Sequence, residues 1–280
     1  MAAASAARLR GLLADIGRSG EVVVAFSGGV DSAFLAATAT DVLGAERTRC
    51  VTAVSPSLPA DELADCRALA AEWGLNWTTV ETHELDNPDY RRNDGDRCAY
   101  CKTALMDALA LLLPPAGSPP AAGPATVVLG VNLDDLGDHR PGRRAAEERG
   151  ARFPLVEAGF AKADVREHSR RLGLRTWDKP AAACLASRVP YGTEVTVPLL
   201  GRIERAEAAL RRLGFTQLRV RDYDDTARLE IPTDDFAKVL ADRDDVVDAV
   251  RSAGYRRVTL DLEGFRSGNL NAALNLPAAV

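Results

Sequence analysis

The segment Ser27-Gly-Gly-Val-Asp-Ser32 joins a continuous apolar run to an apolar helical stretch. Glycines let the backbone turn tightly and approach a phosphate closely, and the start of the following helix offers unpaired N–H donors. The two serine hydroxyls add donors, and the carboxylate of Asp31 suits Mg2+. A Walker P-loop needs Gly-Lys-Ser/Thr, which does not follow here; the simpler alternative is a strand-to-helix turn with a Ser or Asp cap. We expect a phosphate site that uses Ser27, Gly28, Gly29, Asp31 and Ser32.

Five cysteines are the second group of residues with chemical potential. Cys98-Ala-Tyr-Cys101 has a spacing at which two thiolates can bind one metal centre, and Cys184 follows much later in the chain. Cys50 opens an apolar strand and Cys66 sits in a helix, so both are predicted to be ordinary packed thiols. An odd number of cysteines in a chain that reads as cytosolic argues against a disulfide framework.

Alternating strands and helices must position these residues in the first part of the chain. The apolar run over 21–26 is typical of a buried parallel strand, so the phosphate segment falls at the carboxyl end of a strand, where such sheets bind ligands. The pattern predicts a doubly wound α/β domain with a parallel sheet. The expected strands are 21–26, 49–54, 77–81, 126–130 and 153–156. The expected helices are 2–18, 59–73, 98–113 and one that follows Ser32 and runs to about residue 43, and the expected loop is 114–125.

A smaller α+β domain is expected after residue 178. A helix over 199–213 carries its apolar residues on one face. Strand-like runs over 217–221 and 227–231 follow, and then helical stretches over 234–240 and 244–253 and a strand over 256–262. The predicted division is therefore 1–178 and 179–280.

The composition is that of a globular protein with a mildly acidic surface. The 280 residues are 46% hydrophobic and 27% charged, with a formal net charge of -5, so binding of nucleic acid would need a local basic patch. The sequence contains no run of about 18 apolar residues, so no membrane span is expected. The Ala-rich first residues also lack the apolar run of a secretory signal. The chain is therefore expected in the cytoplasm, without a membrane or nucleic-acid partner.

Several segments carry a family resemblance. The phosphate segment resembles the signature of the PP-loop ATP pyrophosphatases (adenine nucleotide alpha hydrolase-like fold), which bind ATP and often transfer AMP to a substrate oxygen with release of pyrophosphate. Further segments resemble those of the LarE-type sulfur transferases of this superfamily, in the family's order, over about residues 5–275. These segments are Asp138-His-Arg-Pro-Gly142, Trp177-Asp-Lys179, Cys184-Leu-Ala-Ser-Arg-Val-Pro-Tyr-Gly192, Arg219-Val-Arg221 and Asp261-Leu-Glu-Gly-Phe-Arg-Ser-Gly268.

The resemblance implies a defined reaction. LarE-type enzymes use ATP and Mg2+ to adenylate a carboxylate of pyridinium-3,5-biscarboxylic acid mononucleotide, and they then replace an oxygen of that carboxylate with sulfur. The product leads to the nickel-pincer nucleotide cofactor of lactate racemase. The implied architecture is a PP-loop domain over 1–178 and a domain for substrate binding and oligomerisation over 179–280, in a homo-oligomer such as a hexamer.

The resemblance also implies a clamp on the substrate phosphate. Arg219 and Arg221 alternate along a strand, so both point to one face. With Arg266 they resemble the family's phosphate-binding arginines, and the guanidinium group suits that task because it presents paired N–H donors. A pair of surface arginines is the alternative.

Four further residues receive roles from the resemblance. Glu207 and Glu230 match acidic positions that hold a metal or orient substrate, and a solvated helix or strand face is the alternative for each. Ser187 and Arg188 are expected to contact the adenylate.

The cysteines bear on the source of sulfur. In one type of the family a cysteine gives up its own sulfur, and that cysteine falls at Ala183 here. Cys98, Cys101 and Cys184 match the ligand set of a [4Fe-4S] cluster with one open iron, which can carry sulfide, and PP-loop tRNA thiolases have a similar arrangement. Cys184 as a sacrificial or persulfide donor, a zinc site and a redox pair are the alternatives.

Three other functions fit part of the sequence. A PP-loop tRNA thiolase would need a basic RNA-binding surface, against which the acidic balance argues. An amide-forming ligase would need an ammonia source and has no use for three cysteines. A nucleotide-binding regulator would not split ATP into AMP and pyrophosphate.

Overall fold

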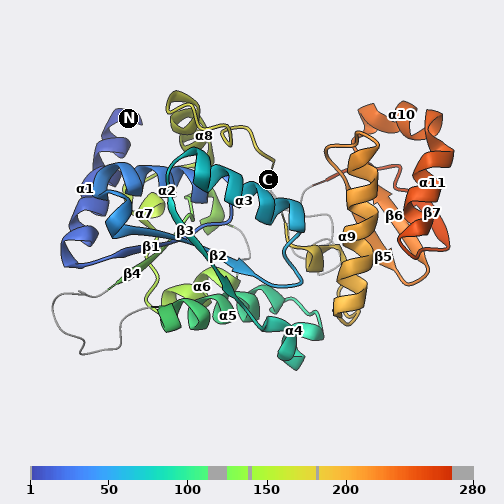
Figure 1. Ribbon diagram of the computed structural model, residues 1–280, viewed down its shortest axis with the longest axis horizontal. Helices are drawn as coiled ribbons and strands as arrows, with labels where there is room; N and C mark the ends of the chain where they lie inside the picture. Colours follow the sequence, from blue (N-terminus) through green and yellow to red (C-terminus); the bar gives the residue numbers. More distant parts are fainter. Residues whose placement is uncertain (1, 113–124, 138–140, 181–182, 267–280) are drawn as a thin grey trace. The chain divides into compact units, whose positions relative to one another are not determined.

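The computed structural model describes residues 2–112, 125–137, 141–180 and 183–266 (Figure 1). They belong to two compact units: unit 1 is Met1–Glu84 with Cys98–Ala182, and unit 2 is Leu85–Arg97 with Ala183–Val280. The division expected after residue 178 places 85–97 in the first domain, but these residues belong to unit 2. Residues 114–124 of the expected loop lie outside the described residues.

A parallel four-stranded sheet forms the centre of unit 1, in the order β3–β2–β1–β4. Central strand β1 pairs with β2 at Val22↔Thr48 and with β4 at Val22↔Thr126. Its residues are almost continuously apolar because helices cover both faces of the sheet. The strands are β1 Val22–Ala25, β2 Thr48–Val54, β3 Asn76–Glu81 and β4 Thr126–Leu129.

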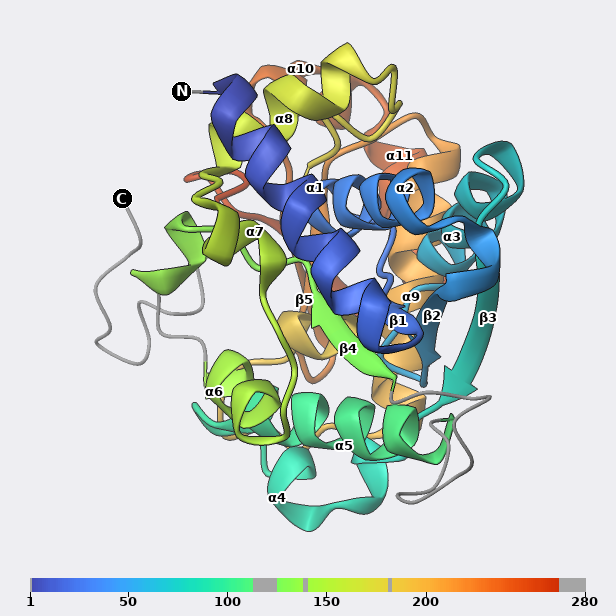
Figure 2. The same ribbon diagram turned by 90° about the vertical axis from the view of Figure 1, so that its left-hand side faces the viewer.

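Successive residues of β1 enter two different cores, one on each face of this sheet. Val22 and Val24 pack on the side of α1 and α2, whereas Val23 packs on the side of α5 and α6, as the period of two in a strand requires (Figure 2). The doubly wound α/β prediction is therefore confirmed. The first face is covered by α1 Ala2–Ser19, α2 Val30–Leu43, α3 Ala60–Glu72, α7 Pro154–Ala158 and α8 Lys162–Arg171, and the second by α5 Arg97–Leu112 and α6 Pro141–Glu148.

The strand predicted over 153–156 is wrong. Arg152 forms a single parallel bridge with Val128, and Pro154 then begins the short helix α7. Proline has no N–H to give to a neighbouring strand, but it suits the first turn of a helix. A short helix that the sequence analysis did not predict, α4 Pro88–Arg91, is capped by the side chain of Asn87.

A three-stranded sheet in the order β5–β6–β7 forms the centre of unit 2. Strands β5 and β6 are antiparallel, and β6 and β7 are parallel. Val220 and Leu229 lie on the apolar face, which packs against the helices, so the smaller α+β domain is also confirmed. The elements are α9 Val197–Arg212, β5 Arg219–Tyr223, β6 Thr226–Glu230, α10 Phe236–Ala241, α11 Arg243–Ser252 and β7 Arg257–Leu260.

Short 3-10 turns lie in the connections of both units: η1 Ala45–Arg47, η2 Glu84–Asp86, η4 Asp134–Leu136, η5 Leu185–Arg188 and η6 Thr233–Asp235. Among the helices of the described ranges, none is long and apolar enough to pass through a membrane.

Candidate active site

The phosphate segment connects the end of β1 to the start of α2. Gly28 adopts a φ of +66°, which residues with a side chain rarely adopt. Gly29 is the N-cap of α2 and supplies no side-chain acceptor, so the first-turn N–H groups lack a side-chain cap in the described structure. The Ser32 hydroxyl donates to the Gly29 carbonyl at 3.1 Å and accepts from the Ser27 N–H at 3.2 Å. The loop is therefore fixed in a shape that presents N–H groups to an anion.

Two residues from other connections hold the carboxylate of Asp31. Its Oδ1 accepts a hydrogen bond from Asn132 Nδ2 at 3.1 Å, and its Oδ2 lies 2.5 Å from the ammonium of Lys162. Asn132 follows β4, and Lys162 is the first residue of α8. A carboxylate fixed beside a phosphate-binding helix terminus is the kind of oxygen ligand that Mg2+ takes, so the residues present fit this ion.

Lys179 anchors the same loop to α3. Its Nζ donates to the Gly28 carbonyl at 3.2 Å and lies 2.8 Å from Glu62 and 2.6 Å from Asp65. Burial alone would lower the pKa of Lys179, but the hydrogen bonds with Asp65 and Glu62 raise it above its ordinary value. Burial would likewise raise the pKa of Asp65, but the hydrogen bonds from Lys179 and Arg175 lower it. The ion pairs thus outweigh desolvation.

Close packing limits the shape of the loop from two further sides. A Cβ added at Gly28 would lie 2.8 Å from Cys66 Sγ, and one added at Gly130 would lie 2.7 Å from the backbone nitrogen of Ser32. Cys66 and Cys50 are both buried, as expected for packed thiols. Burial raises the pKa of Cys66 to about 11 and that of Cys50 to about 12, so neither is a thiolate at neutral pH.

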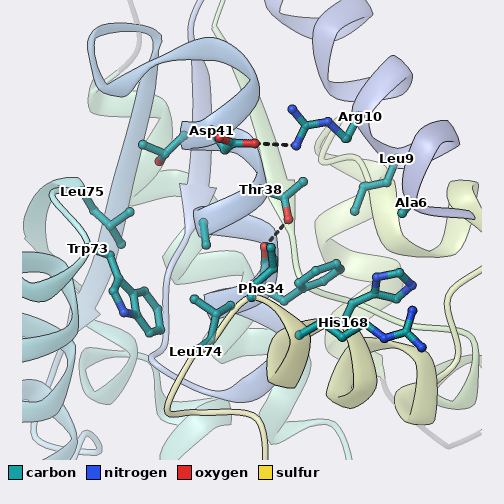
Figure 3. Close-up of a pocket in the computed structure, with 14 residues that line it drawn as sticks. Ala6, Leu9, Arg10, Phe34, Thr38, Asp41, Trp73, Leu75, His168 and Leu174 are labelled. Carbon is teal, nitrogen blue, oxygen red and sulfur yellow. Dashed lines mark hydrogen bonds and ion pairs between the residues drawn. The ribbon is translucent and has the colours of Figure 1, made fainter. Parts of the chain in front are cut away.

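A separate hollow of about 590 Å³ lies beside α1, α2 and α8 (Figure 3). Phe34, Trp73 and Leu174 give it an apolar lining, and the ion pair of Arg10 with Asp41, at 2.5 Å, lies at its edge. It shares no residue with the phosphate segment or with the charged groups around that segment. The candidate active site is therefore defined by hydrogen-bonding groups at the carboxyl ends of the strands and not by this hollow.

In unit 2, Arg188 holds the loop that carries Cys184. Its Nη1 donates to the carbonyls of Ala183 and Cys184 at 2.7 and 3.2 Å. Its Nε and Nη2 meet the two carboxylate oxygens of Glu207 at 2.8 and 3.1 Å, a bidentate pair. Glu207 is fully buried and also accepts from the Val220 N–H at 3.0 Å. The solvated-face alternative for Glu207 is therefore wrong.

Arg221 lies on the polar face of β5 and is 2% exposed. It lies 2.8 Å from Glu230 through Nη2 and donates to the Ser187 carbonyl at 2.5 Å through Nη1. Arg228 also pairs with Glu230, at 3.3 Å. Because Glu230 is fully buried between these arginines, the solvated-face alternative is wrong for this residue too.

Arg219 lies on the same face of β5, as its spacing from Arg221 predicts. Its guanidinium stacks on the Phe265 ring at 4.6 Å, and Nη1 donates to the Arg266 carbonyl at 3.1 Å. Burial first, and then the positive charges of Arg221 and Arg188, lower the pKa of Arg219 to about 10. The positive charges of Arg219, Arg221 and Arg188 are therefore close enough to repel one another, and a bound anion would offset that repulsion. The guanidinium of Arg266 pairs with Glu263, so its role at the substrate stays a prediction.

Cys98 and Cys101 lie one turn apart near the start of α5, on one side of the helix. Cys98 is exposed, Cys101 and Cys184 are half-buried, and no cysteine is in a disulfide. A Cβ added at Gly142 of α6 would lie 2.7 Å from the carbonyl oxygen of Cys98, so the two helices pack closely there. Cys98 and Cys101 belong to unit 1 and Cys184 to unit 2. Across the described ranges no three His, Cys, Asp or Glu side chains form a metal-binding group, so every metal role stays a prediction.

Three residues around the phosphate loop were absent from the predicted site. Asn132 and Lys162 are 101 and 131 residues away from Asp31 in the sequence. Lys179 belongs to a segment that carries the family resemblance, but the sequence alone gives it no role at the phosphate loop. Two features of the sequence could have indicated them: Asn132 comes shortly after an apolar strand, and Lys162 comes at the start of a helix, both places where α/β sheets bind ligands.

A parallel α/β sheet with an uncapped glycine-rich turn between β1 and α2, beside a fixed carboxylate, defines the PP-loop class of nucleotide-binding proteins. The NAD synthase family model matches residues 2–90. The chain is 39% identical, over 253 residues and 90% of both chains, to the pyridinium-3,5-bisthiocarboxylic acid mononucleotide synthase of Lactiplantibacillus plantarum. This chain therefore belongs to the family of that synthase, the LarE family, and the resemblance seen in the sequence is confirmed.

Two further relatives extend over nearly the whole chain. An uncharacterized protein of Synechocystis sp. is 45% identical over 269 residues, which are 95% of this chain and 98% of the relative. An uncharacterized protein of Methanocaldococcus jannaschii is 26% identical over 260 residues, which are 93% and 96% of the two chains.

Proposed function

We propose that this chain is an ATP-dependent sulfur transferase that acts on pyridinium-3,5-biscarboxylic acid mononucleotide. The observation that carries the proposal is the 39% identity, over 90% of both chains, to a synthase of the corresponding bisthiocarboxylic acid mononucleotide. The phosphate loop beside Asp31 supports the ATP-dependent step, and the cationic face of β5 supports binding of a phosphorylated substrate.

Adenylation is the step that the loop geometry serves. A carboxylate is a poor electrophile, because oxide is a poor leaving group. Attack of a carboxylate oxygen on the α-phosphorus of ATP forms an acyl adenylate and releases pyrophosphate. The first-turn N–H groups of α2 and the Ser27 and Ser32 hydroxyls hold the phosphates, and Lys162 offsets their charge. Asp31 would hold Mg2+, which when bound neutralises phosphate charge.

The substrate's own phosphate is bound by the cationic face of unit 2. Arg219 offers a guanidinium whose pKa is lowered first by burial and then by the positive charges of Arg221 and Arg188, so a bound phosphate would remove electrostatic repulsion there. Glu230 orients Arg221, and Glu207 orients Arg188, through ion pairs at 2.8 Å. We therefore assign the two glutamates to the positioning of arginines and not to a metal ion. Ser187 remains a candidate contact for the adenylate.

For the sulfur source, we propose that Cys98, Cys101 and Cys184 bind a [4Fe-4S] cluster. When bound, the cluster supplies an iron without a protein ligand, which can hold the sulfur to be transferred. The support is the chemistry of the donor set: three thiols outside any disulfide, two of them on one side of α5, with Ala183 where a sacrificial cysteine would stand. Arg188 fixes the backbone of Cys184 by donating to its carbonyl.

An assay of the complete reaction tests the function. Protein purified without oxygen, given the mononucleotide, ATP, Mg2+ and a sulfide source, should form AMP, pyrophosphate and a thiocarboxylate that mass spectrometry detects. Asp31→Asn should lower AMP formation by roughly 100-fold or more, because it removes the charge beside the phosphates. Asp41→Asn, an exposed position on the same helix, is the matched control. Normal AMP formation by Asp31→Asn, or no thiocarboxylate from the parent protein, would contradict the proposal.

The cysteines are tested by iron content. The anaerobic protein should be brown and hold about four irons per chain. Replacing Cys98, Cys101 or Cys184 by Ser should lower iron content and stop sulfur transfer while AMP formation continues, and Cys50→Ala should do neither. Colourless protein that turns over once, with loss of the mass of hydrogen sulfide at Cys184, would instead establish Cys184 as a sacrificial donor.

A further inference from the structure

Thr52 is a buried polar residue of unit 1 that no step of the proposed reaction uses. It lies on β2 and is only 2% exposed. By the period of two in a strand it shares the face of Cys50, which packs in the core on the side of α1 and α2. A hydroxyl in such a core needs hydrogen-bond partners, and the identity of these partners points to its role.

The Thr52 hydroxyl has one partner on each neighbouring strand connection. Its Oγ1 lies 2.6 Å from the carbonyl oxygen of Phe26, which follows β1, and 2.9 Å from Nε1 of Trp77 on β3. A carbonyl oxygen can only accept a hydrogen bond, and an indole N–H can only donate one. The hydroxyl therefore donates its single proton to Phe26 and accepts from Trp77, so the indole fixes the direction of the hydrogen bond that Phe26 receives.

Phe26 is the residue directly before the phosphate loop. Its N–H still follows the sheet, because it donates to the Val51 carbonyl at 2.8 Å. The next peptide group, between Phe26 and Ser27, is held by two side chains: Thr52 donates to its carbonyl, and Ser32 Oγ accepts from its N–H at 3.2 Å. Because a peptide group is planar, these two contacts set the direction in which the chain enters the glycine-rich turn.

The two hydroxyls that hold this peptide group have different effects. Ser32 belongs to the loop and to the first turn of α2, so its hydrogen bonds give the loop its shape but do not fix it to the sheet. Thr52 lies on β2, which pairs with β1 on one side and with β3 on the other. The hydrogen bond from Thr52 therefore connects the first peptide of the loop to a strand that is held from both sides.

We propose that Thr52 is a positioning residue for the phosphate loop. Through the Phe26 carbonyl it orients the first peptide of the loop, and so places the Ser27 hydroxyl and the first-turn N–H groups of α2 for the phosphates before a nucleotide binds. Thr52 is too deeply buried to contact the nucleotide itself and acts through the backbone. The purpose of this role rests on the proposed function, because that function assigns the loop to ATP, but the order of the loop can be measured without a nucleotide.

The test compares two threonines of the same strand. Thr52→Val keeps the shape of the side chain but removes the hydroxyl, and Thr52→Ser, which keeps a hydroxyl, tests rescue. Thr48→Val is the matched control: Thr48 is fully buried, lies four residues earlier on the same face of β2, and donates to the Ala39 carbonyl in the second half of α2 at 3.3 Å. Both valine variants lose a buried hydroxyl, but only Thr52 contacts the residue that precedes the loop.

Two measurements are made on the full-length protein. Hydrogen–deuterium exchange without nucleotide follows the backbone amides of 26–32 by mass spectrometry, and AMP formation at saturating mononucleotide and varied ATP gives KM and kcat. Thr52→Val should speed exchange of the Ser27 amide and raise the KM for ATP, each by roughly fivefold, the equivalent of one net hydrogen bond. Thr52→Ser should recover most of both, and Thr48→Val should match the parent. Loss of folded protein alone lowers the apparent kcat and leaves KM unchanged.

The outcomes separate this inference from the proposed function. If the parent protein forms no AMP but exchange of the loop depends on Thr52, the ATP-dependent function is wrong and the positioning of the loop stands. If Thr52→Val behaves like Thr48→Val in both exchange and KM, the positioning role is wrong and the function stands. Faster exchange with an unchanged KM also overturns the role, because the loop then binds phosphate equally well without this contact. Circular dichroism identifies a valine variant that has lost its fold, and the pair Thr52→Ala and Thr48→Ala, whose smaller side chains leave space around the unpaired groups, then gives the same comparison.

Discussion

The carbonyl oxygen of Gly28 meets the ammonium of Lys179 at 3.2 Å, and two carboxylates of α3 complete the surroundings of that ammonium. One side chain thereby connects the backbone of the phosphate loop to a neighbouring helix. The Lys179 side chain is 18% exposed, so solvent screens the ion pairs less than on an open surface. The loop conformation that binds phosphate is thus stabilised before a nucleotide arrives.

Lys179→Met should destabilise the protein and weaken ATP binding together. It keeps most of the side chain's length but leaves Glu62 and Asp65 without their shared cation, at a cost of roughly 1–3 kcal/mol in the free energy of unfolding. The KM for ATP should rise severalfold, while Lys179→Arg should retain most of both properties. Denaturant unfolding and AMP formation at varied ATP measure the two effects. Arg171→Gln, an exposed position on α8, is the control, and an unchanged KM for ATP would contradict the role.

The pKa of Asp65 gives this prediction a pH dependence. Because the pKa of Asp65 is lowered in the folded protein, its ion pair with Lys179 adds stability above the ordinary carboxyl value of about 3.9. That contribution is lost as the pH falls through the lower folded value. The stability difference between the parent protein and Lys179→Met should therefore shrink in acid.

At the scale of elements, the sequence predicted the helices and strands whose own hydrophobic pattern distinguishes a helix from a strand. Strand β1 is continuously apolar, and α9 carries a full apolar face, so both could be read directly. The error over 153–156 arose because a short apolar run fits either a strand or one helical turn, and the proline at position 154 decided for the helix.

The candidate site was predictable only where its residues are close in sequence. The phosphate segment is compact, and the period of two places Arg219 and Arg221 on one face without any tertiary knowledge. Asn132 and Lys162 come from separate connections that the topology brings to Asp31. Segment 85–97 belongs to unit 2 because side chains within it donate hydrogen bonds to backbone carbonyls of that unit. Such contacts leave no periodic pattern in the sequence, so the assignment could not be predicted.

At the scale of the whole molecule, the two units carry different binding tasks under our proposal. Unit 1 holds the ATP phosphates, and unit 2 holds the phosphate of the mononucleotide. Each unit has its own hydrophobic core, so a substitution in one binding region need not disturb the other. The homo-oligomer implied by the resemblance stays a prediction, which light scattering can measure.

Arg219 and Arg221 differ as tests of that division. In the described part of the chain no carboxylate forms an ion pair with Arg219, whereas Arg221 pairs at 2.8 Å with the fully buried Glu230. Arg219→Ala should therefore weaken binding of the mononucleotide by roughly 1.5–3 kcal/mol with little change in stability. Arg221→Ala should also destabilise the fold, by up to about 3–5 kcal/mol, because it removes the 2.8 Å ion pair of a fully buried carboxylate.

Calorimetric titration of each variant with ATP and with the mononucleotide, next to denaturant unfolding, separates the two arginines. ATP affinity should stay within about twofold for Arg219→Ala, because the loop that binds ATP phosphates lies in the other unit. Asp31→Asn should give the opposite pattern, with ATP binding lost and mononucleotide binding kept. Equal loss of both ligands in Arg219→Ala would place this arginine at the ATP site and would remove the assignment of the cationic face to the substrate phosphate.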